Sequence, residues 1–194
     1  MDALAAQPIE HDRGLGTAYE RWCFYQRVER WAVEYGVESA LEGPIDGMAG
    51  VSGVHLVGLA RRGVRVTSAL PTDEKAHIAR GVYARAGATV DVRVVAPNAS
   101  PRAGELPSSD LVVAYHALPL VDDWRAYLAA LAKLARKVLV VTVCNPDNWG
   151  VAAIRLAGRL RGRRDLEPPL AAEVRPLVRA EDESLGEPRA VLVR

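Results

Sequence analysis

Apolar and polar residues follow two different periods along this chain, which predicts that helices and strands alternate. From Thr17 to Gly36, apolar residues recur three and four positions apart, as in a helix with Thr17 as N-cap and Gly36 at its end. The same spacing predicts further helices at 53–63, 72–87, 121–137 and 149–164. Short runs rich in Val and Leu predict strands at 38–43, 64–71, 89–97, 110–118 and 138–146.

Most of the predicted strands are continuously apolar, which is typical of strands with both faces covered. Helices between successive strands favour parallel connections. The pattern therefore predicts an α/β fold, a doubly wound and mostly parallel sheet between helix layers. Residues 171–178 and 189–194 predict two last strands. We expect one domain over residues 1–194, with a helical segment at 1–37 and the sheet-containing core at 38–194.

Composition narrows the possible partners. The 194 residues are 49% hydrophobic and 25% charged, and 25 basic residues against 24 acidic ones leave a net charge of +1. Such a balance gives no strong signal for nucleic acid or for an acidic membrane. Two cysteines, no apolar run long enough to span a bilayer and no signal-like N-terminus indicate a cytoplasmic protein.

The segment "ALEGPIDGMAGVSG", residues 40–53, is rich in glycine directly after the first predicted strand. In a doubly wound sheet this turn lies at the ligand edge, where glycines let a nucleotide-like ligand approach the backbone. Glu42 ends the strand, and a carboxylate there can orient the loop amides and interact with a cationic ligand. We expect the ligand edge at this loop.

The order of elements resembles the class I S-adenosylmethionine-dependent methyltransferases. The resemblance covers residues 14 to about 150 and is carried by "LEGPIDGMAG", "LARRGVRVT", "SSDLVVAYHALPLVDDW" and "KVLVVTVCNP". It implies a seven-stranded Rossmann-like sheet that closes in a C-terminal antiparallel hairpin, here "AAEVRPLV" and "RAVLVR". It also implies S-adenosylmethionine as the cofactor.

The cofactor contacts implied by the resemblance depart from the family pattern. The loop lacks the regular glycine spacing, and Leu70 stands where the family has the acid that binds the ribose, with Asp73 and Glu74 shortly after it. Asp46 is a candidate replacement for that acid, and Asn98 is the candidate for the adenine edge. The full set of candidate cofactor-binding residues is Glu42, Gly43, Asp46, Gly47, Gly50, Leu70, Asn98 and Tyr19.

Candidate catalytic residues follow the fourth predicted strand. Methyl transfer is an in-line attack that depends mainly on alignment. His116 has an ordinary pKa near neutrality and is the candidate general base, with Tyr115 beside it facing the methyl group. The alternative is that Tyr115 and His116 only pack and form hydrogen bonds at a strand end.

Three other features have a functional and a structural interpretation. Tyr19 and Trp22 are candidates to cover the ligand, although a helix core face explains them better. "CNPDNWG" offers Asn145, Asn148 and Trp149 for acceptor binding, or an Asx turn and helix cap. The basic segment from Arg155 to Arg164 suits phosphate groups, and a solvated helix end explains it better. His55 and His77, in predicted helices, are expected at the surface or hydrogen-bonded.

Three functions follow from these observations. The leading one is a methyltransferase for an unknown, small-molecule acceptor, with no metal, since no cluster has metal-ligand spacing. The alternative is a degenerate Rossmann-like module that binds or scaffolds without using the cofactor. A nicotinamide-dependent reductase is disfavoured, because the missing acid would bind ribose there too and the loop lacks Gly-x-Gly-x-x-Gly. An oligomer is possible in each case.

Overall fold

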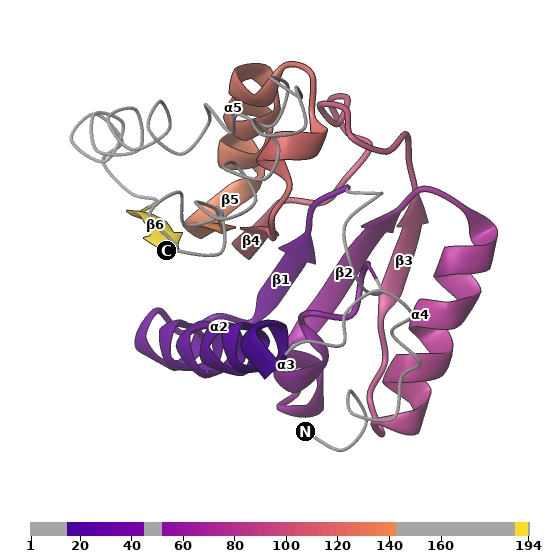
Figure 1. Ribbon diagram of the computed structural model, residues 1–194, viewed down its shortest axis with the longest axis vertical. Helices are drawn as coiled ribbons and strands as arrows, with labels where there is room; N and C mark the ends of the chain where they lie inside the picture. Colours follow the sequence, from indigo (N-terminus) through magenta and orange to yellow (C-terminus); the bar gives the residue numbers. More distant parts are fainter. Residues whose placement is uncertain (1–14, 45–51, 143–188, 194) are drawn as a thin grey trace, which may run out of the picture.

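The computed structural model describes residues 15–44, 52–142 and 189–193, and its centre is a parallel sheet (Figure 1). The strands are β1 (Ser39–Glu42), β2 (Arg65–Leu70), β3 (Asp91–Val94), β4 (Ser109–Ala114), β5 (Ala135–Thr142) and β6 (Arg189–Val193). Their order is β3-β2-β1-β4-β5-β6, and each neighbouring pair is parallel. The predicted α/β class and parallel sheet are confirmed, and the strand order reverses between β1 and β4.

The predicted seven-stranded sheet with a closing antiparallel hairpin is corrected by the described part of the chain, which has six strands. β6 pairs with β5 in parallel, from Val138 opposite Arg189 to Thr142 opposite Val193. A parallel neighbour needs a crossover of about a dozen residues or more. The sequence has residues 143–188 between the end of β5 and the start of β6, which is more than this minimum. The other predicted hairpin arm, 171–178, lies outside the described residues, as does the predicted helix at 149–164.

Four α-helices are described, and three differ from the predicted bounds. They are α2 (Leu15–Glu34), α3 (Val57–Arg61), α4 (Asp73–Arg85) and α5 (Trp124–Leu134), with a 3-10 turn at Leu118–Leu120. Thr17 lies inside α2 and is not its N-cap; threonine costs a helix interior only a fraction of a kcal/mol, so it does not fix a helix start. α5 is shorter than predicted because the chain passes directly into β5 at Ala135.

The start and end signals of α4 are confirmed. The Thr72 side chain accepts a hydrogen bond from the Lys75 amide (3.2 Å), and Asp73 and Glu74 occupy the first turn, where carboxylates suit the helix dipole. Gly87 follows the helix with a positive φ of 70°, a conformation that glycine adopts without strain. None of the helices of the described residues is both long enough and apolar enough to cross a membrane.

Each face of the sheet has its own core. Side chains of α2, α3 and α4 pack on one face against alternate strand residues that include Val66, Leu70 and Val113. α5 packs on the opposite face through Trp124, Tyr127 and Leu131 (Figure 1). The alternation along each strand thus assigns its even and odd positions to different layers.

β3 departs from the general prediction that both faces of the strands are covered. It is the edge strand, with Asp91, Arg93 and Val94 exposed. A loop connects β3 to β4 where the other parallel connections from β1 to β2, from β2 to β3 and from β4 to β5 have a helix. Consequently, α5 is the one described α-helix on this face of the sheet, and part of the face near β3 is open.

Candidate functional site

The carboxylate of Glu42 organises the carboxyl end of β1. Its Oε1 accepts a hydrogen bond from the backbone N–H of Gly53 (2.9 Å), and Oε2 accepts one from the backbone N–H of His55 (3.1 Å). The Nδ1 of His55 lies 2.6 Å from Oε1 and donates to the carboxylate. Glu42 is 1% exposed, so these are buried, charge-assisted bonds. Glu42 therefore orients loop amides directly, as its position suggested.

The segment that Glu42 holds is fixed from a second side. Gly53 has a φ of +81°, and its carbonyl accepts a hydrogen bond from the Ser68 hydroxyl (2.9 Å). A Cβ on Gly53 would lie 2.8 Å from Leu70, so the glycine is required by close packing. Leu70, the residue at the family's ribose position, is fully buried and forms this contact. The turns at 52–56 also explain why α3 begins later than predicted.

Gly43 is required by the protein's own packing. A Cβ there would lie 2.9 Å from the Tyr127 hydroxyl and 3.3 Å from the Val113 carbonyl. The Tyr127 hydroxyl donates to the Pro44 carbonyl (3.2 Å), which ties α5 to the segment after β1. Burial raises the pKa of Tyr127, and the negative charge of Glu42 raises it further. The absence of a side chain at Gly43 thus allows Tyr127 of α5 to pack closely against the segment after β1.

Aromatic rings cover the Glu42–His55 pair, and we call Phe24, Glu42, His55, Tyr115 and His116 the edge cluster. The rings of His55 and Tyr115 are stacked, with centroids 4.2 Å apart, and Phe24 meets Tyr115 edge-on at 4.8 Å. Tyr115 is 5% exposed. Packing at a strand end, the structural alternative for Tyr115, matches this geometry.

His116 is the half-buried member of the edge cluster. It has a φ of +47°, and its backbone N–H donates to the Thr142 hydroxyl (2.7 Å) at the end of β5. Asn98, with a φ of +54°, is the other non-glycine residue with positive φ among the described residues. Such conformations cost of the order of 1 kcal/mol or more and are concentrated at functional sites. Both residues follow strand ends at the predicted ligand edge.

A pocket of about 460 Å³ opens beyond the ends of β2 and β3. Its lining includes Pro71, Val94 and Ala99, with Arg102 and Glu105 from the loop before β4. The Arg102 amide donates to the Glu105 carboxylate (2.8 Å), which shapes this loop. The volume is in the range of small-molecule sites.

The structure brings some predicted site residues together and leaves others apart. Glu42, Gly43, Leu70, Tyr115 and His116 lie at or beside the carboxyl edge. Trp22 lies on α2 and is 40% exposed. The predictions for Asp46, Gly47, Gly50, Asn145, Asn148, Trp149, the Arg155–Arg164 segment and the Tyr19 side chain lie outside the described part of the chain.

His55 is the main residue that the sequence analysis did not select. It lies in a turn, so the predicted helix at this position is wrong. It is 3% exposed and hydrogen-bonded, so of its two expected environments, surface or hydrogen-bonded, the second is correct. His77 is exposed on α4. An acid at a strand end and a histidine just after a glycine loop were the available signals for the pair. In the described residues no group of three or more His, Cys, Asp and Glu side chains is arranged to hold a metal ion.

Comparisons with known proteins give likenesses to solved structures only. No family model matches the chain, and no curated protein matches it. The fold is similar to that of the StiE O-methyltransferase region, with a TM-score of 0.44 and 12% identity. The match covers 58% of this chain and 39% of that one.

Proposed function

We propose that this protein is an S-adenosylmethionine-dependent methyltransferase that acts on a small-molecule acceptor. The observation that carries the proposal is the parallel order β3-β2-β1-β4-β5, with its switch point flanked by Glu42 on β1 and His116 after β4. Ligands of such sheets bind outside the carboxyl ends of the strands at the switch point. The resemblance of the sequence motifs selects the cofactor.

The proposal gives the residues of this edge specific roles. The nucleoside would occupy the 460 Å³ pocket beyond β2 and β3. Asp73 and Glu74 are exposed on the first turn of α4, just after β2, and would bind the ribose hydroxyls in place of the acid that Leu70 replaces. The acceptor nucleophile would attack the sulfonium methyl in line as the methyl–sulfur bond breaks, and His116 would take the nucleophile's proton.

A specific observation favours the second candidate, a binding or scaffolding module without catalysis. Both oxygens of Glu42 are occupied by internal donors, and Leu70 is buried against Gly53. A carboxylate used in this way holds the fold together without any ligand. Under this interpretation, the edge cluster is a structural core that the fold retains.

Calorimetric titration with S-adenosylmethionine and with its demethylated product tests the proposal, with nicotinamide cofactors as controls. We expect micromolar binding of the first pair only. The double variant Asp73→Asn, Glu74→Gln should weaken it roughly tenfold or more, since two charge-assisted hydrogen bonds are removed, while Glu34→Gln, on exposed α2 surface, should not. No binding to folded protein would refute cofactor use and leave the binding module.

The catalytic role of His116 needs its own experiment. Once an acceptor is found, His116→Ala should lower turnover by roughly 100-fold while cofactor affinity is kept, because general base catalysis contributes about that much. His77→Ala is the matched control on the exposed face of α4. Equal turnover in the two variants would exclude His116 from the chemistry.

A further inference from the structure

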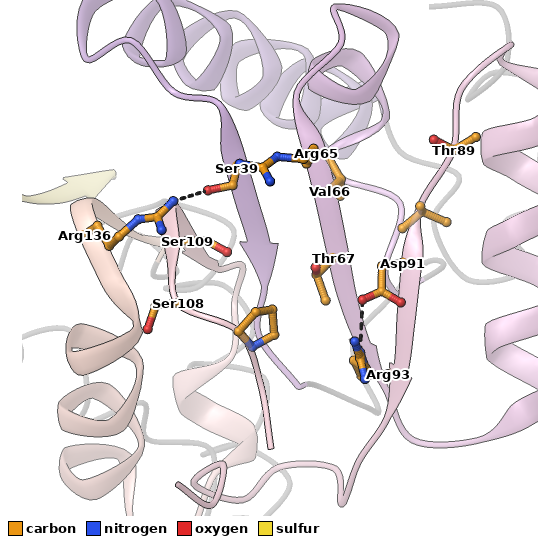
Figure 2. A pocket seen from close by; sticks show the side chains of 12 residues that line it. Ser39, Arg65, Val66, Thr67, Thr89, Asp91, Arg93, Ser108, Ser109 and Arg136 are labelled. Carbon is orange, nitrogen blue, oxygen red and sulfur yellow. Dashed lines mark hydrogen bonds and ion pairs between the residues drawn. The ribbon is translucent and has the colours of Figure 1, made fainter. Parts of the chain in front are cut away.

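A second pocket lies at the opposite edge of the sheet, where the strands begin. It has a volume of about 420 Å³ and is lined by residues from the amino ends of β1, β2, β3 and β4 and by Arg136 of β5 (Figure 2). It lies on the face where a loop, not a helix, joins β3 to β4. Ser39 lines this pocket and Glu42 ends the same strand, so the pocket is separate from the carboxyl edge.

The pocket carries positive charge. Its lining has three arginines, Arg65, Arg93 and Arg136, and one acid, Asp91. Asp91 accepts a bond from the Nε of Arg93 (3.0 Å), which leaves the terminal nitrogens of that guanidinium outside the bond. Arg65 and Arg136 have no acidic partner within the pocket lining. An anion with several oxygens is the ligand that such a set of guanidinium groups recognises.

One guanidinium of the pocket is held in a fixed position. The Nε of Arg136 donates to Asp110 (3.1 Å), and its Nη2 donates to the Ser39 hydroxyl oxygen (2.8 Å). Burial alone would raise the pKa of Asp110, but the hydrogen bond from the Glu38 amide and the charge of Arg136 keep that pKa below its ordinary value. A charged Asp110 therefore orients Arg136, and the remaining donors of the guanidinium are available to a ligand.

The hydroxyl groups of the pocket are arranged as donors. The Ser39 oxygen already accepts two hydrogen bonds, from Arg136 and from the Asp110 amide (3.0 Å). Its lone pairs are used, so its hydrogen can only be donated. Thr67 is 8% exposed and Ser109 is 2% exposed, both line the pocket, and among the described residues neither hydroxyl has a hydrogen bond. Hydroxyl groups without protein partners at a cavity wall can donate hydrogen bonds to an oxygen-rich ligand.

Figure 2 shows how these groups converge. Arg136 reaches Ser39 from β5, and Arg65, whose Cα is paired with that of Ser39 in the sheet, extends toward the same serine from β2. Thr67 lies two residues further along β2 on the same face. We propose that this pocket binds the phosphate group of a small phosphomonoester. The guanidinium groups of Arg65 and Arg136 bind the phosphate oxygens, and Ser39 and Thr67 donate hydrogen bonds to it.

The size of the pocket distinguishes an ester from free phosphate. A volume of about 420 Å³ is in the range of sites for complete small molecules and exceeds the needs of a single phosphate ion. The side chains of Thr89 and Ser108 also line the pocket and offer polar groups for the remainder of such a ligand. A phosphomonoester is therefore expected to bind more tightly than inorganic phosphate.

The experiment is calorimetric titration of the full chain with ribose 5-phosphate, inorganic phosphate, ribose and succinate. We expect ribose 5-phosphate to bind most tightly, phosphate more weakly and ribose not at all up to about 10 mM. Arg65→Gln should lower the affinity for ribose 5-phosphate roughly tenfold, because a charge-assisted hydrogen bond is lost. Arg65 has no side-chain bond in the described structure, so folding should be unaffected. Arg80→Gln, an exposed α4 residue, is the matched control and should change affinity less than about twofold.

Thr67→Val provides an independent check, because it removes only a hydroxyl and keeps the side-chain shape. It should also lower the affinity for ribose 5-phosphate while leaving the thermal unfolding midpoint near the wild-type value. The proposal is overturned if folded protein binds no phosphate compound, if free phosphate or succinate binds as tightly as the ester, or if Arg65→Gln and Arg80→Gln have equal effects. These results do not depend on S-adenosylmethionine binding, which is measured at the other edge.

Discussion

Replacing Glu42 by glutamine should strongly destabilise the protein, although the change is nearly isosteric. If the amide oxygen of glutamine takes the place of Oε1, it can still accept from Gly53 and from His55 Nδ1. The amide nitrogen then faces the backbone N–H of His55, which loses its acceptor at 3.1 Å. A buried N–H without a partner costs about 1–3 kcal/mol, and the two remaining bonds lose their charge assistance. We expect a loss of about 3 kcal/mol in the free energy of unfolding.

Urea unfolding measures this loss. With a slope of about 2 kcal/mol per molar urea, the midpoint should fall by about 1.5 M. Glu29→Gln is the matched control, since Glu29 also has a side-chain partner, Arg62, but its side chain is 25% exposed. An exposed pair contributes about 0–1 kcal/mol. Equal midpoints for the two variants would refute the conclusion that Glu42 anchors residues 53–55.

Three further predictions concern single contacts. Gly43→Ala should cost about 1–3 kcal/mol of stability because its Cβ would lie 2.9 Å from the Tyr127 hydroxyl; in a Tyr127→Phe background the added cost should be smaller, and chemical denaturation of the four proteins compares the two costs. Asp110→Asn should destabilise by about 2 kcal/mol at pH 7. Because the pKa of Asp110 is lowered in the folded protein, this stabilisation is present above the ordinary carboxyl pKa and disappears as the pH falls through the lower folded pKa. The melting curves of wild type and variant should therefore converge in acid. A constant difference in stability down to pH 3 would contradict this. Thr72→Ala should cost about 1 kcal/mol, and Thr72→Ser, which keeps the cap to Lys75, should restore most of it in the same melting assay.

The α/β class and the two ends of α4 were accessible from the sequence because each depends on local signals. The cap at Thr72 and the positive φ at Gly87 follow from single residues. The α/β class follows from apolar runs that alternate with helical spacing. The exposure of β3 was not accessible, because Val-rich strands look alike at the edge and in the centre of a sheet. Only the absence of a helical pattern between residues 95 and 108 pointed to the open face.

The candidate site was predictable in place but not in detail. The position of Glu42 at the end of β1 was enough to assign it to the backbone amides of the following loop. That Gly43 is required by Tyr127 depends on tertiary packing that no local pattern contains, because Tyr127 lies 83 residues after its hydrogen-bond partner Pro44 along the chain. The pairing of His55 with Glu42 is of the same kind, because it is a contact between residues that are 13 positions apart along the chain and that no local pattern links.

The buried part of the edge cluster has a structural role under both proposed functions. Glu42 and His55 stabilise the turn after β1 whether or not a ligand is bound, so their loss would lower stability and cofactor affinity together. Residues that are accessible at the same edge do not have this ambiguity. Asp73 and Glu74 are exposed, and His116 is half-buried with its backbone held by Thr142. Substitutions of these three side chains should disturb the fold less than loss of Glu42 or His55, so an effect on cofactor affinity or turnover of folded protein reports mainly on the ligand edge.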